Sequence, residues 1–207
     1  SEVWLNTLSS LTYPQRFTEK ERTVQLTGEA YFKVASDKKH RFNVQTPQKM
    51  VVSAYGTEFN VNAYENEANH VVTLASGNVE ISSGLDSKVM VALAVDEKAI
   101  LNTSTGNMNV VATDTYVETA WKDGKMVFRR EKLDNIATRL SRKFGVDIAL
   151  EGQKLKEYEY TATFTDETLE DILDLLKRSA PISYSISSQK KLENETYSRK
   201  KVTIISQ

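Results

Sequence analysis

Apolar side chains recur at every second position through most of the first half of the chain. Between residues 26 and 35 (LTGEAYFKVA), the small and apolar residues fall on one side of an extended chain: Leu26, Gly28, Ala30, Phe32 and Val34. The polar residues Glu29, Tyr31 and Lys33 fall on the other side. This alternation is typical of a β-strand that buries one of its faces. Any fold of this chain must therefore cover that apolar face.

The same alternation returns in the segments 49–64, 70–83 and 88–95. Turn-forming residues separate these segments at intervals of about 8–12 residues, a spacing that indicates a sandwich, a barrel or a β-solenoid. No helical pattern is present between Val3 and Val117. We therefore predict a mainly β N-terminal domain over residues 1–117, with a β-sandwich or β-solenoid-like fold.

The hydrophobic period changes beyond a polar turn cluster at residues 102–109. In the segment 131–145, apolar residues have the spacing of one helix face, and Gly145 stands where a helix C-cap is expected. The segment 165–181 repeats this spacing, with Asp166 or Thr168 as the N-cap. Two amphipathic helices are therefore predicted in the second half.

The two helical segments match each other at an offset of 36 residues, for example at Phe128 and Phe164 and at Leu133 and Leu169. The match extends into an apolar strand pattern on either side of each helix. We therefore predict a small α+β domain over residues 118–207, built from two β-α-β repeats and a terminal strand, KVTIIS.

The composition excludes several classes of function. The chain has 207 residues, no cysteine and a net charge of −1, so it has neither the basic excess of a nucleic-acid-binding protein nor the thiols for a disulfide or a Cys-based site. It has no apolar run of the length that spans a bilayer. Because the chain begins at Ser1 and enters a strand pattern by Val3, we expect a fragment from which any targeting or anchoring segment has been removed.

The sequence gives little support for catalysis or for a cofactor. The two histidines, His40 and His70, lie in separate turn-like contexts, so we expect both to be exposed and unliganded. The sequence contains no glycine-rich nucleotide-binding motif and no G-x-S-x-G nucleophile motif. We therefore predict a non-enzymatic protein without a metal ion or cofactor.

Two features leave a carbohydrate-directed function open. On a strand, Glu157 and Glu159 would share a face about 7 Å apart, and glycosidases use such paired carboxylates, although a solvated strand face also explains them. Trp4 and Trp121 could form a sugar platform, although a tryptophan that opens a strand is more often part of the core. A glycan-binding module and a hydrolase therefore remain as alternatives.

Four motifs recur in a fixed order in the first half: VWLNTLSSLTYP from Val3, GEAYFKVA from Gly28, GTEFNV from Gly56 and VTLASGNV from Val72. Their order and spacing over residues 2 to 101 resemble the periplasmic region of FecR-type anti-sigma factors. The second half is similar to the small signalling domains at the N-termini of secretins and TonB-dependent receptors. The segment LAVDEKAIL (93–101) departs from the family pattern because it lacks the usual Pro-Gly turn.

The resemblance implies the periplasmic signalling region of a transmembrane anti-sigma factor in the inner membrane of a Gram-negative bacterium. It implies two partners: an extracytoplasmic-function sigma factor, held by a cytoplasmic segment beyond a missing transmembrane helix, and the signalling domain of a TonB-dependent outer-membrane transporter. Many such proteins come from Bacteroidetes, where the transporter imports glycans, and iron-siderophore import is the other common case. No nucleic-acid partner is implied.

A transporter signalling domain is itself a small sheet domain, and two such domains can join by pairing strands at their edges. The predicted partner-binding edge is the terminal strand, which comprises Val202, Thr203, Ile204, Ile205 and Ser206. The segment Tyr160–Phe164 is the other candidate edge, and an inner, already paired position is the alternative for the terminal strand. On the same interpretation, the polar face of residues 26–35 is expected to be the solvated outside of a core strand.

Overall fold

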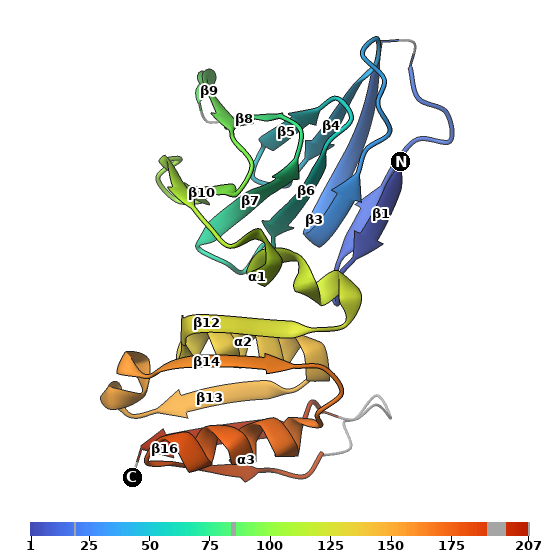
Figure 1. Cartoon of the computed structure of the whole chain (residues 1–207). Helices are drawn as coiled ribbons and strands as arrows, with labels where there is room; N and C mark the ends of the chain where they lie inside the picture. Colours follow the sequence, from blue (N-terminus) through green and yellow to red (C-terminus); the bar gives the residue numbers. More distant parts are fainter. Residues whose placement is uncertain (19, 84–85, 190–197, 207) are drawn as a thin grey trace. The chain divides into compact units, whose positions relative to one another are not determined.

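A computed structural model describes residues 1–18, 20–83, 86–189 and 198–206. The chain divides into two units, Ser1–Asp123 and Gly124–Gln207 (Figure 1). The helix α1 (Thr115–Thr119) and the short 3-10 helix η1 (Ala120–Asp123) close the first unit. The domain limits 1–117 and 118–207 stay a prediction, and α1 crosses the limit between them.

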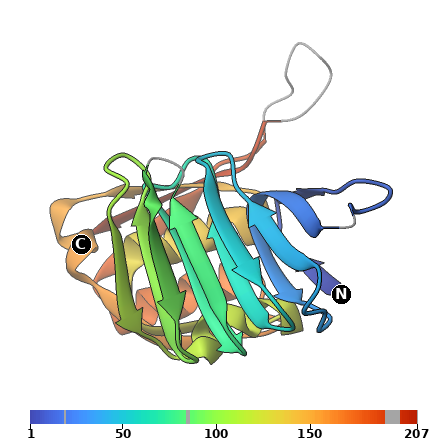
Figure 2. The same ribbon diagram turned by 90° about the horizontal axis from the view of Figure 1, so that it is seen from above.

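The strands of the first unit form a single sheet with the order β11-β10-β7-β6-β3-β4-β5-β8-β9, and β1 and β2 also pair with β3. Figure 2 looks onto these strands from above, where they lie side by side. Their bounds are β1 (Glu2–Leu5), β2 (Ser10–Thr12), β3 (Glu21–Lys33), β4 (Arg41–Gln45), β5 (Met50–Ala54), β6 (Glu58–Ala63), β7 (Asn69–Ser76), β8 (Val79–Ser83), β9 (Asp86–Leu93), β10 (Glu97–Asn102) and β11 (Met108–Ala112).

The long strand β3 joins the two halves of this sheet. Its segment Glu21–Gln25 pairs in parallel with β4, whereas its segment Gly28–Lys33 pairs antiparallel with β6. The sheet curves until β9 contacts β10, so it closes into a near-barrel around one apolar core. The predicted β-sandwich or β-solenoid-like fold is therefore wrong. Alternation reports that one face is buried, but it does not distinguish two stacked sheets from one sheet that curves onto itself.

The apolar face of β3 lies in this core, as predicted: Leu26, Ala30 and Phe32 have no exposed surface. The prediction that its polar face is solvated is wrong at Glu29 and Tyr31, which are 9% and 4% exposed. Side chains from other elements cover this face, as described below.

The second unit contains two amphipathic helices at the predicted places. Its elements are β12 (Met126–Lys132), α2 (Leu133–Phe144), β13 (Asp147–Glu151), the 3-10 helix η2 (Gln153–Glu157), β14 (Glu159–Phe164), α3 (Leu169–Ser179), β15 (Ile182–Ile186) and β16 (Lys201–Ser206). Gly145 ends α2 in the left-handed conformation, with φ of +63°. Thr168 caps α3, because its hydroxyl accepts the N–H of Asp171 while the Asp171 carboxylate accepts the N–H of Thr168.

The predicted pair of β-α-β repeats is wrong. The two strands that flank each helix lie in different sheets: β12 pairs antiparallel with β14, and β16 lies between β13 and β15. Each segment does have the order strand, helix, strand, and the equivalent residues Phe128 and Phe164 pack against each other with ring centres 6.1 Å apart. The sequence repeat therefore reflects a shared order of strand, helix and strand. The strands of the two copies are joined directly, through the β12–β14 pair, or through β16, which pairs with β13 and β15.

We expect Gly28→Val to destabilise the first unit. Gly28 has φ of +92°, and a Cβ atom there would lie 2.8 Å from Ser9 Cα, too close for any side chain. Overpacking of this kind costs about 1–3 kcal/mol, added to about 1–2 kcal/mol for the left-handed backbone. Urea denaturation gives the free energy of unfolding. Gly124→Ala is the control, because Gly124 also has a positive φ but has no atom within 4 Å of the added Cβ. Equal stability of Gly28→Val and the unmodified chain would contradict this packing.

We expect His70 to make the first unit less stable as the pH falls. Burial lowers the pKa of His70 below 6.5, by more than the Tyr64 carbonyl and the Glu67 carboxylate raise it. Below pH 6.5 the unfolded chain therefore binds a proton that the folded chain resists, so stability decreases by at most about 1.4 kcal/mol per pH unit. Denaturation at pH 7 and pH 5 measures this slope. His70→Phe should flatten the slope. A slope unchanged in His70→Phe would refute the assignment.

Candidate partner-binding site

The strand β14 has one free edge in the part of the chain that the structure describes. It pairs with β12, and no described strand pairs with its other side. The N–H of Leu133 donates to the Tyr158 carbonyl at 3.0 Å, and alternate residues of an antiparallel strand direct their N–H and C=O groups to the same neighbour. The main-chain groups of Glu159, Thr161 and Thr163 therefore point away from β12. They are available to another strand.

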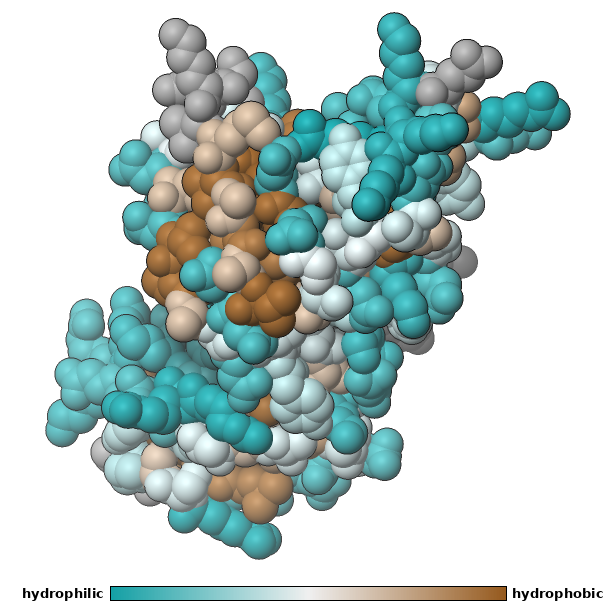
Figure 3. Space-filling view, turned by 45° about the horizontal axis from the view of Figure 1, so that its top comes forward, coloured by the Kyte–Doolittle hydropathy of each residue, from teal (hydrophilic) through white to brown (hydrophobic). Residues whose placement is uncertain are grey.

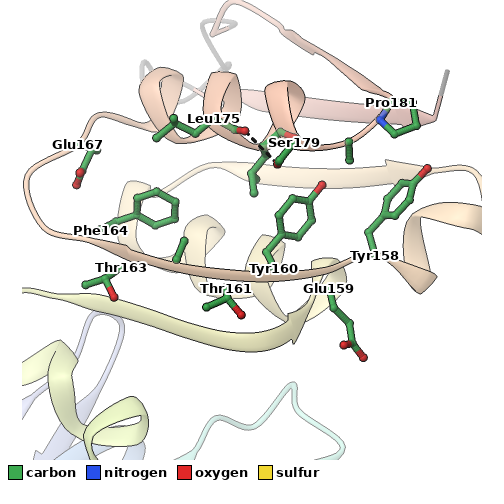
Figure 4. A pocket seen from close by; sticks show the side chains of 13 residues that line it. Tyr158, Glu159, Tyr160, Thr161, Thr163, Phe164, Glu167, Leu175, Ser179 and Pro181 are labelled. Carbon is green, nitrogen blue, oxygen red and sulfur yellow. Dashed lines mark hydrogen bonds between the residues drawn. The ribbon is translucent and has the colours of Figure 1, made fainter.

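A groove of about 610 Å³ lies beside this edge, between β14 and the C-terminal part of α3. Figure 4 shows Tyr160 and Phe164 of β14, and Tyr158 directly before this strand, pointing towards α3, whereas Thr161 and Thr163 point away from it. The full lining is Tyr158, Glu159, Tyr160, Thr161, Ala162, Thr163, Phe164, Glu167, Leu175, Leu176, Ser179, Ala180 and Pro181. The groove thus combines aromatic and aliphatic walls with a free strand edge.

Two side chains that line this groove are in an unfavourable environment in the isolated chain. Leu175 is 44% exposed, although it is a large apolar residue. The Tyr160 hydroxyl is buried and has no hydrogen-bond partner among the described residues. Burial, followed by the neighbouring Tyr158, raises the pKa of Tyr160, so the hydroxyl keeps its proton at neutral pH. An unpaired buried O–H is costly to the folded chain.

The predicted partner-binding residues lie elsewhere, in the middle of the other sheet. The strand β16, which carries Val202, Thr203, Ile204, Ile205 and Ser206, pairs in parallel with β13 and antiparallel with β15. The edge-strand prediction is therefore wrong for this segment. An apolar segment without proline suits a central strand as well as an unprotected edge, so composition alone misplaced it. Within β16, Ile205 is 41% exposed.

The polar face of β3 carries a second cluster, built from buried hydrogen bonds. The Glu29 carboxylate accepts hydrogen bonds from Asn6 Nδ2 at 2.7 Å and from Asn60 Nδ2 at 2.9 Å. Trp121 Nε1 donates to Asn60 Oδ1 at 3.2 Å. This network fixes β1 and the segment η1 to the sheet, so Glu29 has a structural role.

Tyr31 extends the same cluster. Its hydroxyl donates to Glu58 Oε2 at 2.7 Å, and burial raises its pKa further above the ordinary value. The Trp4 ring packs edge-on against the Tyr31 ring at 5.7 Å, and Lys122 Nζ lies 5.4 Å from the centre of the same ring. Both tryptophans considered for a sugar platform therefore contribute to this structural cluster.

The remaining predicted residues do not assemble into a catalytic or metal site. His40 Nδ1 lies 2.7 Å from Asp37 Oδ2, and this contact lowers the pKa of Asp37. The prediction that His70 is exposed is wrong, because its side chain is buried within the first unit and has no exposed surface. Glu157 ends η2 while Glu159 begins β14 and pairs with Arg130, so the two carboxylates do not share a strand face.

The described residues contain neither a metal-binding cluster nor a membrane-spanning helix. No group of three or more His, Asp or Glu side chains is placed to hold a metal ion there. None of the helices described is long and apolar enough to cross a membrane.

The comparisons with known proteins agree with the resemblance seen in the motifs. The family described as FecR protein matches residues 1–80, and the family described as FecR, C-terminal, matches residues 125–193. The chain is also similar to two crystal structures of a candidate anti-sigma factor from Parabacteroides distasonis ATCC 8503. No curated protein matches the chain.

The two structural matches extend over nearly the whole chain. The structure at 1.65 Å resolution shares 25% identity and has a TM-score of 0.83, and the match covers 99% of this chain and 90% of that one. The structure at 2.50 Å resolution shares 27% identity and has a TM-score of 0.80, with 99% and 89% covered. The similarity therefore includes both units.

We expect Tyr160→Phe to stabilise the isolated protein. The substitution removes a buried hydroxyl that has no partner in the described part of the chain, so unfolding should become about 1 kcal/mol less favourable. Tyr184→Phe is the matched control, because the Tyr184 hydroxyl donates to Asp174 Oδ1 at 2.8 Å. That control should lower stability by no more than about 1 kcal/mol. Thermal denaturation of both variants tests the contrast, and a destabilised Tyr160→Phe would show that its hydroxyl is already satisfied.

Proposed function

Because the chain belongs to the FecR family of anti-sigma factors, we propose that it senses the signalling domain of a TonB-dependent outer-membrane transporter and so controls an extracytoplasmic-function sigma factor. Proteins of this family are membrane-anchored regulators with periplasmic sensing regions, and an anti-sigma factor acts on a sigma factor. On this proposal the chain works in the periplasm as a non-enzymatic binding module. The sigma factor is contacted by a segment outside this chain.

The free edge of β14 is the observation that supports this role most directly. A partner strand can add to such an edge through main-chain hydrogen bonds, while its side chains fill the neighbouring pockets. The outward main-chain groups of Thr161 and Thr163 can make the main-chain hydrogen bonds, and the groove against α3 can receive the side chains. The transporter's signalling domain, a small sheet domain, can offer such a strand.

The chemistry of the groove defines what that strand should carry. One apolar side chain can lie between Tyr158, Tyr160 and Pro181, and a second one can cover the exposed part of Leu175. The proposal does not depend on the transporter's cargo, glycan or iron-siderophore, because the contact is made with the signalling domain.

We expect the signalling domain of the transporter encoded beside this gene to bind the chain, with Leu175→Lys weakening the binding at least about tenfold, or 1.4 kcal/mol. A lysine there places a hydrated charge on the apolar rim of the groove. Ile205→Lys is the matched control: Ile205 is similarly exposed, at 41% against 44%, but belongs to β16. Calorimetric titration measures the three dissociation constants.

The pattern of the two variants decides where the interface lies. Loss of binding in Leu175→Lys alone supports the groove, whereas loss in Ile205→Lys alone moves the interface to β16. A chain that fails to bind the signalling domain at all would refute the proposed function.

A further inference from the structure

The hairpin formed by β10 and β11 carries no charge over most of its length. No acidic or basic residue lies between Ala99 and Thr113, and β11 stands at one end of the sheet of the first unit. Edge strands are usually protected by lysine, proline or a β-bulge. The strand β11 contains neither residue, and its pairing with β10 is regular from Met108 to Ala112.

The free main-chain groups of β11 are arranged symmetrically about Val110. The N–H of Asn102 donates to the Asn107 carbonyl, and the N–H of Thr113 donates to the Asp96 carbonyl, both at 2.9 Å. Residues of the same parity as Asn107 and Thr113 therefore direct their groups to β10. The groups of Met108, Val110 and Ala112 point to the outer edge, where no described strand pairs with them.

The side chains of this edge are also unusually apolar for a solvated strand. Val110 and Val111 point to opposite faces of the sheet, yet they are 40% and 41% exposed. Met90 on β9 and Val95 before β10 are 57% and 47% exposed, and β9 contacts β10. Figure 3 shows apolar side chains gathered on this part of the first unit. Apolar areas of this kind mark interaction surfaces.

We propose that β11 pairs antiparallel with β11 of a second copy of this chain, about a two-fold axis at Val110. In this register Val110 lies opposite its own copy, and Met108 lies opposite Ala112, so every outward main-chain group of the strand finds a partner. The contact is isologous, which closes it as a dimer. A two-fold axis places like residues near each other, and an edge without charge is the kind that tolerates this without repulsion.

The experiment is sedimentation equilibrium of the whole chain over a range of concentrations. We expect a concentration-dependent dimer for the unmodified chain and a monomer for Val110→Lys, because the axis would place two lysines opposite each other. Tyr13→Lys is the matched control: Tyr13 is 64% exposed but lies beyond β2, outside this edge. It should dimerise like the unmodified chain.

A mixing experiment tests the position of the axis. Val110→Glu alone should also be monomeric, and a mixture of Val110→Lys with Val110→Glu should restore a dimer, because the two charges would then be opposite. Restoration supports the register about Val110. An unmodified chain that stays monomeric at its highest soluble concentration, a Val110→Lys variant that dimerises normally, or a mixture that stays monomeric would overturn the proposal.

Discussion

The first unit depends on the pairing of β3 along both of its edges. Its segment Glu21–Gln25 pairs with β4, its residues Gln25, Leu26 and Thr27 pair with β2, and its second half lies between β6 and β1. The strand changes partners at Gly28, where φ is +92° and the Ser9 hydroxyl accepts the N–H of Glu29 at 2.8 Å. Only glycine combines that conformation with so close an approach of another chain segment. One residue without a side chain therefore allows a single sheet to bend into a near-barrel.

The same strand explains why its polar face is buried. Asn6 follows β1, which pairs with β3, and Trp121 belongs to η1. Both side chains need polar partners, and Glu29 together with Asn60 supplies them. Buried polar groups are costly when one partner is missing, so a fully connected network favours a single arrangement of these elements. The apolar face of β3 thus forms part of the hydrophobic core. Its polar face holds chain segments that are distant in sequence in place through hydrogen bonds.

Local patterns in the sequence predicted the elements of this fold well, and its pairings poorly. The helices α2 and α3, the cap at Gly145 and the buried face of β3 follow from spacing within a few residues. The position of β16 between β13 and β15 does not, because a central strand and an unprotected edge have the same composition.

The same limit applies to side chains whose surroundings come from distant segments. His70 lies in a polar stretch of sequence but is buried in the core by the strands around it. Of the candidate site, the sequence offered Tyr160–Phe164 as a possible edge. It carried no signal for the groove, because α3 forms the opposite wall.

Among the described residues, the free edges of β14 and β11 differ in charge, and this difference is consistent with the different partners proposed for them. The edge of β14 is bordered by Glu159, which pairs with Arg130, and by Glu167 at the end of the groove. Charges at a rim favour a different protein, because complementary charges steer association and exclude wrong partners. The edge of β11 has no such charges and is symmetric about one valine, so a second copy of the same strand meets no repulsion there. On the two proposals, the chain binds the transporter domain through its second unit and its own copy through its first unit.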